Sequence, residues 1–266
     1  MKDYKKEFDK FVGMLERGEN FGFSRFSDGE IFILKNQKLV LEQNRFVTGD
    51  RSGAGYYTKE EEKNYDPKSH RHISERLKDC LSSKKKNYFK GLSCNEDTDI
   101  CLEEDVLKYQ MSLSSGDEDH LTFSNLFINA NYPRFINEFL PVLKTKKIVF
   151  VANENADLSK LGLNIVKDFR IGNNCFVNNY DLPSEINEWI EANDIQDVVF
   201  LISASTLTNF IVKDGFFSHP NNTYIDIGSS LNPWMGLEGW QYSRAYLQHW
   251  VLGRHNKYGI QEDSWS

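Results

Sequence analysis

The stretch Phe23-Ser24-Arg25-Phe26-Ser27-Asp28-Gly29-Glu30 places two carboxylates one glycine apart, directly after a short apolar run. Residues i and i+2 of an extended backbone point to the same side, so a strand ending in Asp-x-Glu can aim Asp28 and Glu30 at one cation. Carboxylates suit Mg²⁺ or Mn²⁺, ions that commonly bind substrate phosphates as well. The sequence therefore predicts a metal site and a phosphate or diphosphate substrate. Asp-Gly is also an ordinary turn dipeptide, so a surface turn is the alternative.

Two neighbours of this motif fit a phosphate ligand. Gly29 allows a ligand to approach the backbone closely. Arg25 brings a fixed positive charge with planar, bidentate donors. We therefore expect both residues to belong to the same binding loop.

The longer motif Arg-Phe-Ser-Asp-Gly-Glu resembles the opening of bacterial glycosyltransferases of the GT-D fold. As in those enzymes, the motif is preceded by an amphipathic N-terminal helix and followed by an apolar run, here residues 31–34. In these nucleotide-sugar-dependent enzymes the Asp-x-Glu binds a divalent metal and, through it, the donor diphosphate. The resemblance implies Asp28 and Glu30 as metal-site residues for Mn²⁺ or Mg²⁺, with Arg25, Ser27 and Gly29 as the surrounding donor-binding loop.

The resemblance extends more loosely along most of the chain, to the late word Tyr224-Ile225-Asp226-Ile227-Gly228. The chain also departs from the family pattern. Family members often carry Gly where this chain has Ser27, and a Gly-Pro-like word where it has Ser203-Ala204-Ser205-Thr206. The details of donor contact therefore stay open.

Length and charge fit a compact enzyme. The 266 residues are sufficient for a sizeable core, and we expect a single α/β domain over residues 1–266. A formal net charge of −7 without a strongly basic segment argues against a nucleic-acid partner. The N-terminus has no apolar signal region and no window is apolar enough to span a bilayer, so we expect a cytoplasmic protein whose membrane contact, if any, is peripheral.

Helical and strand patterns alternate along the chain. Amphipathic spacing predicts a helix over residues 3–17, and similar patterns predict helices at 70–82, 184–192 and 206–212, with helical periodicity from 118 to 143 that Pro133 breaks. Short apolar runs predict strands at 21–26, 88–92, 147–152, 164–169, 197–203 and 223–227. This order indicates an α/β, Rossmann-like fold with a mostly parallel sheet flanked by helices.

Ligands of such sheets bind beyond the carboxyl ends of the strands. We therefore expect Ser203, Ser205 and Thr206 to contact the donor, since they follow a strand and open a helix, although helix capping explains them equally well. Asp226 follows the last predicted strand and is our candidate for the catalytic base, with a turn carboxylate as the alternative. Glu238 and His249 are the rival candidates for the base.

Two other segments carry weaker signals. The polar stretch between Gly49 and Pro67, with residues 48–55 as its most flexible part, fits either a mobile lid or a plain linker. Four of the five tryptophans, Trp234, Trp240, Trp250 and Trp265, lie in the last 33 residues. Aromatic faces suit a sugar or a nucleobase, but packing against the core is the more common use of such residues.

Two functional classes remain open from the sequence. The first is a metal-dependent glycosyltransferase, specifically a hexosyltransferase, that moves a sugar from a nucleoside diphosphate donor such as a UDP-sugar to a glycan, glycolipid or glycoprotein acceptor. The alternative is a Rossmann-like methyltransferase, or a non-catalytic protein that binds nucleotides or sugars. A methyl-donor motif is expected at the first strand of its domain, whereas residues 224–228 follow several strands. The dinucleotide fingerprint Gly-x-Gly-x-x-Gly is absent from the sequence.

Overall fold

The structure is a computed structural model that describes residues 2–42, 45–46, 62–93, 106–128 and 131–237. At Asp28 and Glu42 and in the pair 45–46 it describes the backbone alone. Within this described part, no helix is long and apolar enough to cross a membrane.

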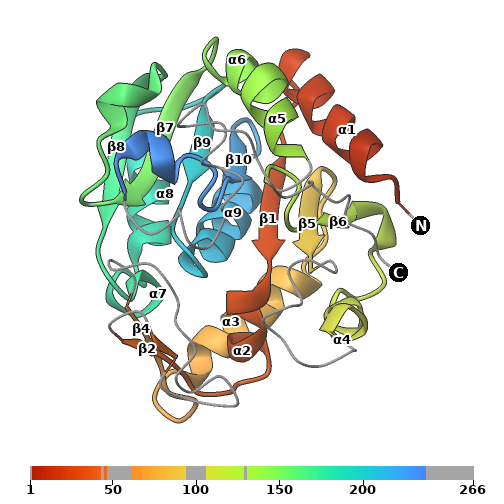
Figure 1. The fold of residues 1–266 in the computed structure, drawn as a ribbon, viewed down its shortest axis with the longest axis vertical. Helices are drawn as coiled ribbons and strands as arrows, with labels where there is room; N and C mark the ends of the chain where they lie inside the picture. Colours follow the sequence, from red (N-terminus) through yellow and green to blue (C-terminus); the bar gives the residue numbers. More distant parts are fainter. Residues whose placement is uncertain (1, 43–44, 47–61, 94–105, 129–130, 238–266) are drawn as a thin grey trace, which may run out of the picture.

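The main sheet has seven strands, and every neighbouring pair in it is parallel (Figure 1). In spatial order the strands are β6 (Leu121–Phe123), β5 (Tyr88–Leu92), β1 (Gly22–Phe26), β10 (Thr223–Asp226), β9 (Val199–Ile202), β7 (Lys147–Asn153) and β8 (Asn164–Ile171). The first and the last of the described strands thus lie side by side at the centre. The predicted α/β class with a parallel sheet is confirmed.

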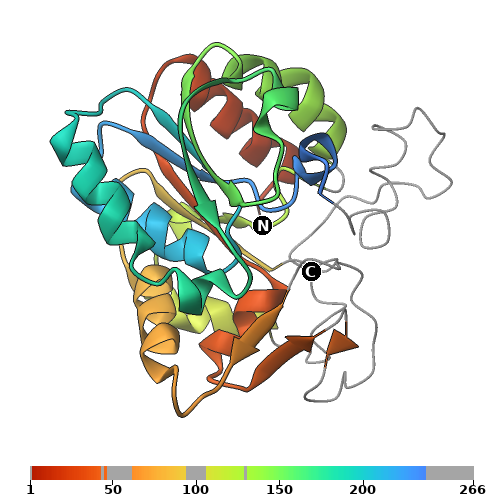
Figure 2. The same cartoon turned by 90° about the vertical axis from the view of Figure 1, so that its left-hand side faces the viewer.

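Helices cover both faces of this sheet, as Figure 2 shows. One face carries α1 (Tyr4–Glu16), the short α5 (Tyr132–Arg134), a π-helical turn (Phe135–Phe139), α6 (Leu140–Leu143) and the 3₁₀ turns η5 (Leu158–Leu161) and η6 (Asn232–Met235). The other face carries α3 (Arg71–Ser82), α4 (Val106–Leu113), α7 (Cys175–Asn178), α8 (Leu182–Ala192) and α9 (Leu207–Ser218). Side chains of one strand alternate between the two cores: Val149 and Val151 face α8, whereas Phe150 packs on the side of α1.

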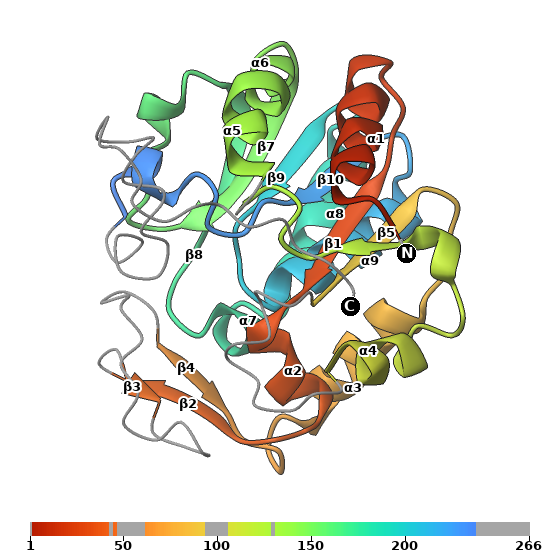
Figure 3. The same cartoon turned by 45° about the vertical axis from the view of Figure 1, so that its right-hand side comes forward.

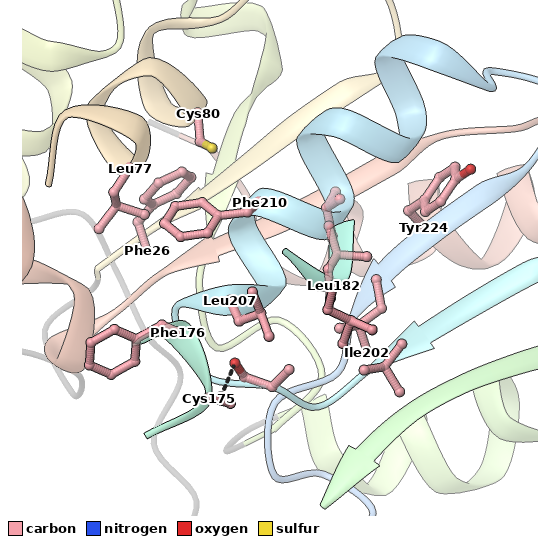
Figure 4. Close-up of a cluster of buried hydrophobic side chains, with 14 of the residues drawn as sticks. Phe26, Leu77, Cys80, Cys175, Phe176, Leu182, Ile202, Leu207, Phe210 and Tyr224 are labelled. Carbon is pink, nitrogen blue, oxygen red and sulfur yellow. Dashed lines mark hydrogen bonds between the residues drawn. The ribbon is translucent and has the colours of Figure 1, made fainter. Parts of the chain in front are cut away.

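The interior strands are buried on both faces, which explains their continuous apolar runs. On the α9 side, Phe26, Leu207 and Phe210 meet in one cluster (Figure 4). At the edge of this cluster the Cys175 thiol donates to the Ala204 carbonyl over 3.2 Å, which ties α7 to the turn between β9 and α9.

A second, antiparallel sheet lies beyond the carboxyl end of β1, beside α7 and the short helix α2 (Asp28–Leu34) (Figure 3). Its strands, in the order β3 (Arg45–Phe46), β2 (Leu39–Glu42) and β4 (Lys63–Tyr65), were not predicted. Asn174 anchors β4: its backbone N–H donates to the Glu62 carbonyl (2.9 Å), and its side-chain Oδ1 accepts from the Asn64 N–H (3.0 Å). The small sheet is therefore attached to the start of α7.

Most predicted helices and strands agree with the structure, but the helix predicted between residues 118 and 143 does not. This region is not one interrupted helix, because it contains the 3₁₀ turn Glu118–His120 and the buried strand β6 before α5 begins. Pro133 stands in the first turn of α5, where its missing N–H breaks no helical hydrogen bond, so it starts a helix instead of breaking one.

Candidate active site

The carboxylate motif starts a helix instead of ending a strand, which corrects the geometry expected from the sequence. β1 ends at Phe26, and Ser27 is the N-cap of α2, whose first three residues are Asp28, Gly29 and Glu30. Successive helical residues are rotated by about 100°, so the strand rule that residues i and i+2 point to the same side does not apply to this motif. The signal was present, because Ser27-x-x-Glu30 before an apolar run is the sequence pattern of a capping box.

Glu30 holds together two turns that are far apart in the chain. Its Oε2 accepts from the Ser27 N–H (3.1 Å) and from the Ser27 hydroxyl (3.3 Å), while its Oε1 accepts from the Thr206 hydroxyl (3.0 Å). Glu30 is 7% exposed and Thr206 is 1% exposed. These contacts bring the predicted loop after β1 and the predicted turn after β9 into one site.

Thr206 thus contacts a carboxylate of the site. It is the N-cap residue of α9, yet it makes no side-chain bond to the first turn of that helix, so helix capping alone does not account for it. The preceding turn contains Ser205 with a positive φ of 48°, and the Ala204 N–H donates to the Thr208 hydroxyl (3.0 Å). The side chains of Ser203 and Ser205 are half-buried.

Arg25 connects the ends of three strands. Its backbone N–H donates to Asp226 Oδ2 (3.2 Å), its Nη1 lies 3.9 Å from Asp226 Oδ1, and its Nε donates to the carbonyl of Ser124, which follows β6. The guanidinium packs against Gly228, where φ is +48° and an added Cβ would lie 1.8 Å from Nη1. Arg25 and Asp226, predicted from opposite ends of the chain, are therefore direct neighbours.

Asp226 is almost completely buried, and its Oδ1 also accepts from the Gly228 N–H (2.9 Å). Burial raises the pKa of this carboxyl to about 7; the Arg25 guanidinium and the two backbone N–H groups oppose the rise, whereas the charge of Glu30 adds to it. The buried carboxylates of Asp226 and Glu30 thus lie close enough to repel each other, an arrangement that favours uptake of a proton or a further cation.

Sequence reasoning missed the amides that hold the end of β1. Asn209 of α9 donates to the Ser24 hydroxyl (2.9 Å) and to the Arg25 carbonyl (2.6 Å). Gln110 of α4, on the same face of the sheet, donates to the Phe26 carbonyl (2.8 Å). Thr208 and Asn209 are polar residues in the otherwise apolar first half of α9, and they were the signal available in the sequence.

Several predicted features lie outside the described residues: the lid segment 48–55, the rival bases Glu238 and His249, and Trp240, Trp250 and Trp265. Trp234 is described and lies in η6, half-buried, where its indole N–H donates to the Tyr132 hydroxyl (3.3 Å). Among the described residues, no group of three or more His, Cys, Asp or Glu side chains could hold a metal ion.

The position of these residues in the sheet defines the class of protein. β1 is followed along the sheet by β5 on one side, whereas β10 is reached through β9 on the other, so the strand order reverses between β1 and β10. In open α/β sheets, ligands bind outside the carboxyl ends at such a reversal. Arg25 and Asp226 lie at this point, as does the start of α2, so this is a Rossmann-like protein with its candidate site at the reversal.

No family model and no curated protein match the chain. Solved structures do match it. A glycosyltransferase of the domain of unknown function 1792 from Streptococcus sanguinis superposes with a TM-score of 0.53 and 12% identity over 97% of this chain and 88% of that one. A second structure of that domain, described as a distinct glycosyltransferase fold, gives 0.51 and 11% over 97% and 84%. The chain thus has this glycosyltransferase fold, as its resemblance to the GT-D fold implied.

Proposed function

We propose that this protein is a metal-dependent glycosyltransferase that moves a sugar from a nucleoside diphosphate donor, such as a UDP-sugar, to a glycan, glycolipid or glycoprotein acceptor. The observation that carries the proposal is the convergence of Arg25, Glu30 and Asp226 at the reversal point of the sheet. The fold is that of glycosyltransferases, which supports the same reaction class.

The residues fit a hard divalent cation such as Mn²⁺ or Mg²⁺. Carboxylate oxygen is the ligand type these ions prefer, and Mg²⁺ usually keeps several waters while binding one or two carboxylates plus substrate phosphates. Burial is the main cause of the raised pKa of Asp226, and the negative charge of Glu30, which adds to it, would be offset by such an ion. Asp28 and Glu30 would hold it, and when bound it supplies neutralisation of the departing diphosphate.

The chain's own groups supply the other roles. Thr206 and Ser27 fix the carboxylate of Glu30 from two sides. Ser203, Ser205 and the N–H of Gly29 border the same turn region and are the proposed donor contacts, together with Arg25. Asp226 is the proposed base for the acceptor hydroxyl, because a raised pKa near 7 suits proton abstraction at neutral pH.

The test is a panel of nucleotide sugars incubated with the full chain and Mn²⁺, with release of nucleoside diphosphate as the readout. We expect release from one donor, its loss in excess EDTA and its recovery when Mn²⁺ is added back. Asp28→Asn should abolish release. Lys144→Met is the matched control, because Lys144 is exposed at the amino end of β7, away from the site. Release that survives EDTA, or that Asp28→Asn leaves unchanged, would contradict the metal-dependent mechanism.

The same panel separates the alternatives. A non-catalytic binding protein would bind a nucleotide sugar and release nothing even with an acceptor mixture present. A methyltransferase would bind S-adenosylmethionine instead, and binding of that donor with none of any nucleotide sugar would replace the proposed function.

A further inference from the structure

A lysine from the small sheet reaches the carboxylate turn. A Cβ built on Gly29 would lie 3.5 Å from the Lys63 ammonium nitrogen. Lys63 belongs to β4, and Gly29 lies between the two acidic residues of α2. A cation therefore stands directly beside the backbone of the Asp28–Glu30 turn.

Two anchors fix the direction of this side chain. β4 pairs with β2, and on its other side Asn174 bonds to the backbone of Glu62 and Asn64. Alternate residues of a strand share a face, so Lys63 points the same way as Tyr65, which is fully buried in the core of the main domain. Lys63 is thus directed inward toward α2.

The position of Lys63 differs from that of Arg25. The guanidinium of Arg25 is buried, and it contacts Asp226, Gly228 and the Ser124 carbonyl at the ends of the main-sheet strands. Lys63 is half-buried and approaches the turn from outside the main sheet. Its ammonium group is a compact point charge with three rotatable donors, which suits phosphate oxygens whose positions change during a reaction.

We propose that Lys63 is a binding residue for the donor's diphosphate, reaching the Asp28–Glu30 turn from the small sheet. This inference rests on the proposed function, because it assigns one contact in the same site. It gives the small sheet a role: β4 carries a phosphate-binding cation to a turn built by β1 and α2.

The experiment is calorimetric titration of the full chain in Mn²⁺ with ADP, CDP, GDP and UDP in turn, followed by the uncharged nucleoside of the tightest binder. We expect Lys63→Met to weaken the best diphosphate about tenfold, the effect of one lost charge-assisted hydrogen bond. Binding of the nucleoside should not change. The salt dependence of diphosphate binding should become shallower, and Lys63→Arg should restore most of the affinity. Lys144→Met, with the same change in net charge, should bind as the unmodified chain does.

Each contrary result has a distinct meaning. Diphosphate binding by Lys63→Met within twofold of the unmodified chain overturns the inference and leaves the proposed function standing. Equal weakening of diphosphate and nucleoside, with a lowered thermal midpoint, also overturns it, because Lys63 would then only support the turn. If the unmodified chain binds no nucleoside diphosphate, the proposed function fails together with the inference.

Discussion

At the scale of single residues, Gly228 shows how a backbone position controls the site. Its φ of +48° lies in the left-handed region, and the Arg25 guanidinium occupies the space that a side chain would take. Gly228→Ala should destabilise the fold by about 1 kcal/mol for the conformation and by roughly 1–3 kcal/mol more for the displaced guanidinium. Denaturant unfolding measures the sum.

Gly162→Ala is the matched control for this prediction. Gly162 also has a positive φ, of 62°, but nothing lies within 4 Å of its added Cβ. The Gly162→Ala variant should therefore lose only the free energy of unfolding that corresponds to placing alanine at a positive φ. Equal losses in the two variants would mean that Arg25 moves away from Gly228 without penalty.

Asp226 should make stability depend on pH. Its pKa is raised to about 7 in the fold from an ordinary value of 3.8, so the folded chain holds a proton that the unfolded chain has lost. Between these two values the free energy of unfolding contributed by this group falls as pH rises, by about 1.4 kcal/mol per unit of pKa shift.

Asp226→Asn should remove this slope. Its lost acceptor adds a penalty that does not depend on pH, so the readout is the change of thermal midpoint between pH 5 and pH 8, measured in EDTA. The midpoint of the unmodified chain should fall more over this range than that of the variant. Parallel curves would mean that Asp226 is ionised throughout, with Arg25 outweighing its burial.

At the scale of elements, one hydrogen bond joins α2 to α9. The Thr206 hydroxyl and Glu30 Oε1 are both buried, so Thr206→Val leaves a carboxylate oxygen without this donor, at a cost of about 1–3 kcal/mol. Thr206→Ser keeps the hydroxyl and should be nearly neutral. We expect the Mn²⁺ affinity, measured by calorimetry, to fall in the Thr206→Val variant and to remain unchanged in the Thr206→Ser variant. An unchanged affinity in Thr206→Val would show that Glu30 is oriented by Ser27 alone.

Elements also show what the sequence could predict. Buried parallel strands are short apolar runs, so β5 was located at its observed bounds and β1 within one residue. α2 was missed because extended geometry was assumed to continue from the end of β1 through Ser27 to Glu30. The small sheet was missed because β4 is only three residues long and is held partly by Asn174, 110 positions away.

At the scale of the whole molecule, the part of the site that lies at strand ends could be predicted from the rule that ligands of parallel sheets bind beyond the carboxyl ends of the strands. That rule places the ends of β1 and β10 together, and Arg25 and Asp226 do meet there. It says nothing of groups that arrive through helices or a second sheet. Asn209 reaches the site from helix α9 and Lys63 from the small sheet, so no local sequence pattern predicted their positions there.

The layout of the sheet predicts a gradient of local stability. β1 and β10 are interior strands, whereas β8 is an edge of the described sheet with most of its side chains at least partly exposed. In hydrogen exchange followed by mass spectrometry, peptides covering β1 and β10 should exchange slowest and those covering β8 much faster. Comparable protection in β8 would indicate that another chain covers this edge.

The pairing of β1 with β10, which are far apart in the sequence, also bears on how the protein is made. β1 can pair with β10 only after some 200 further residues have been synthesised, since Arg25 and Asp226 are 201 positions apart. At a typical translation rate this takes roughly 10–40 s. During that time an apolar strand edge at the ribosome lacks its partner, and such an edge is a natural target for chaperones. The site therefore forms only after β10 has been synthesised and has paired with β1.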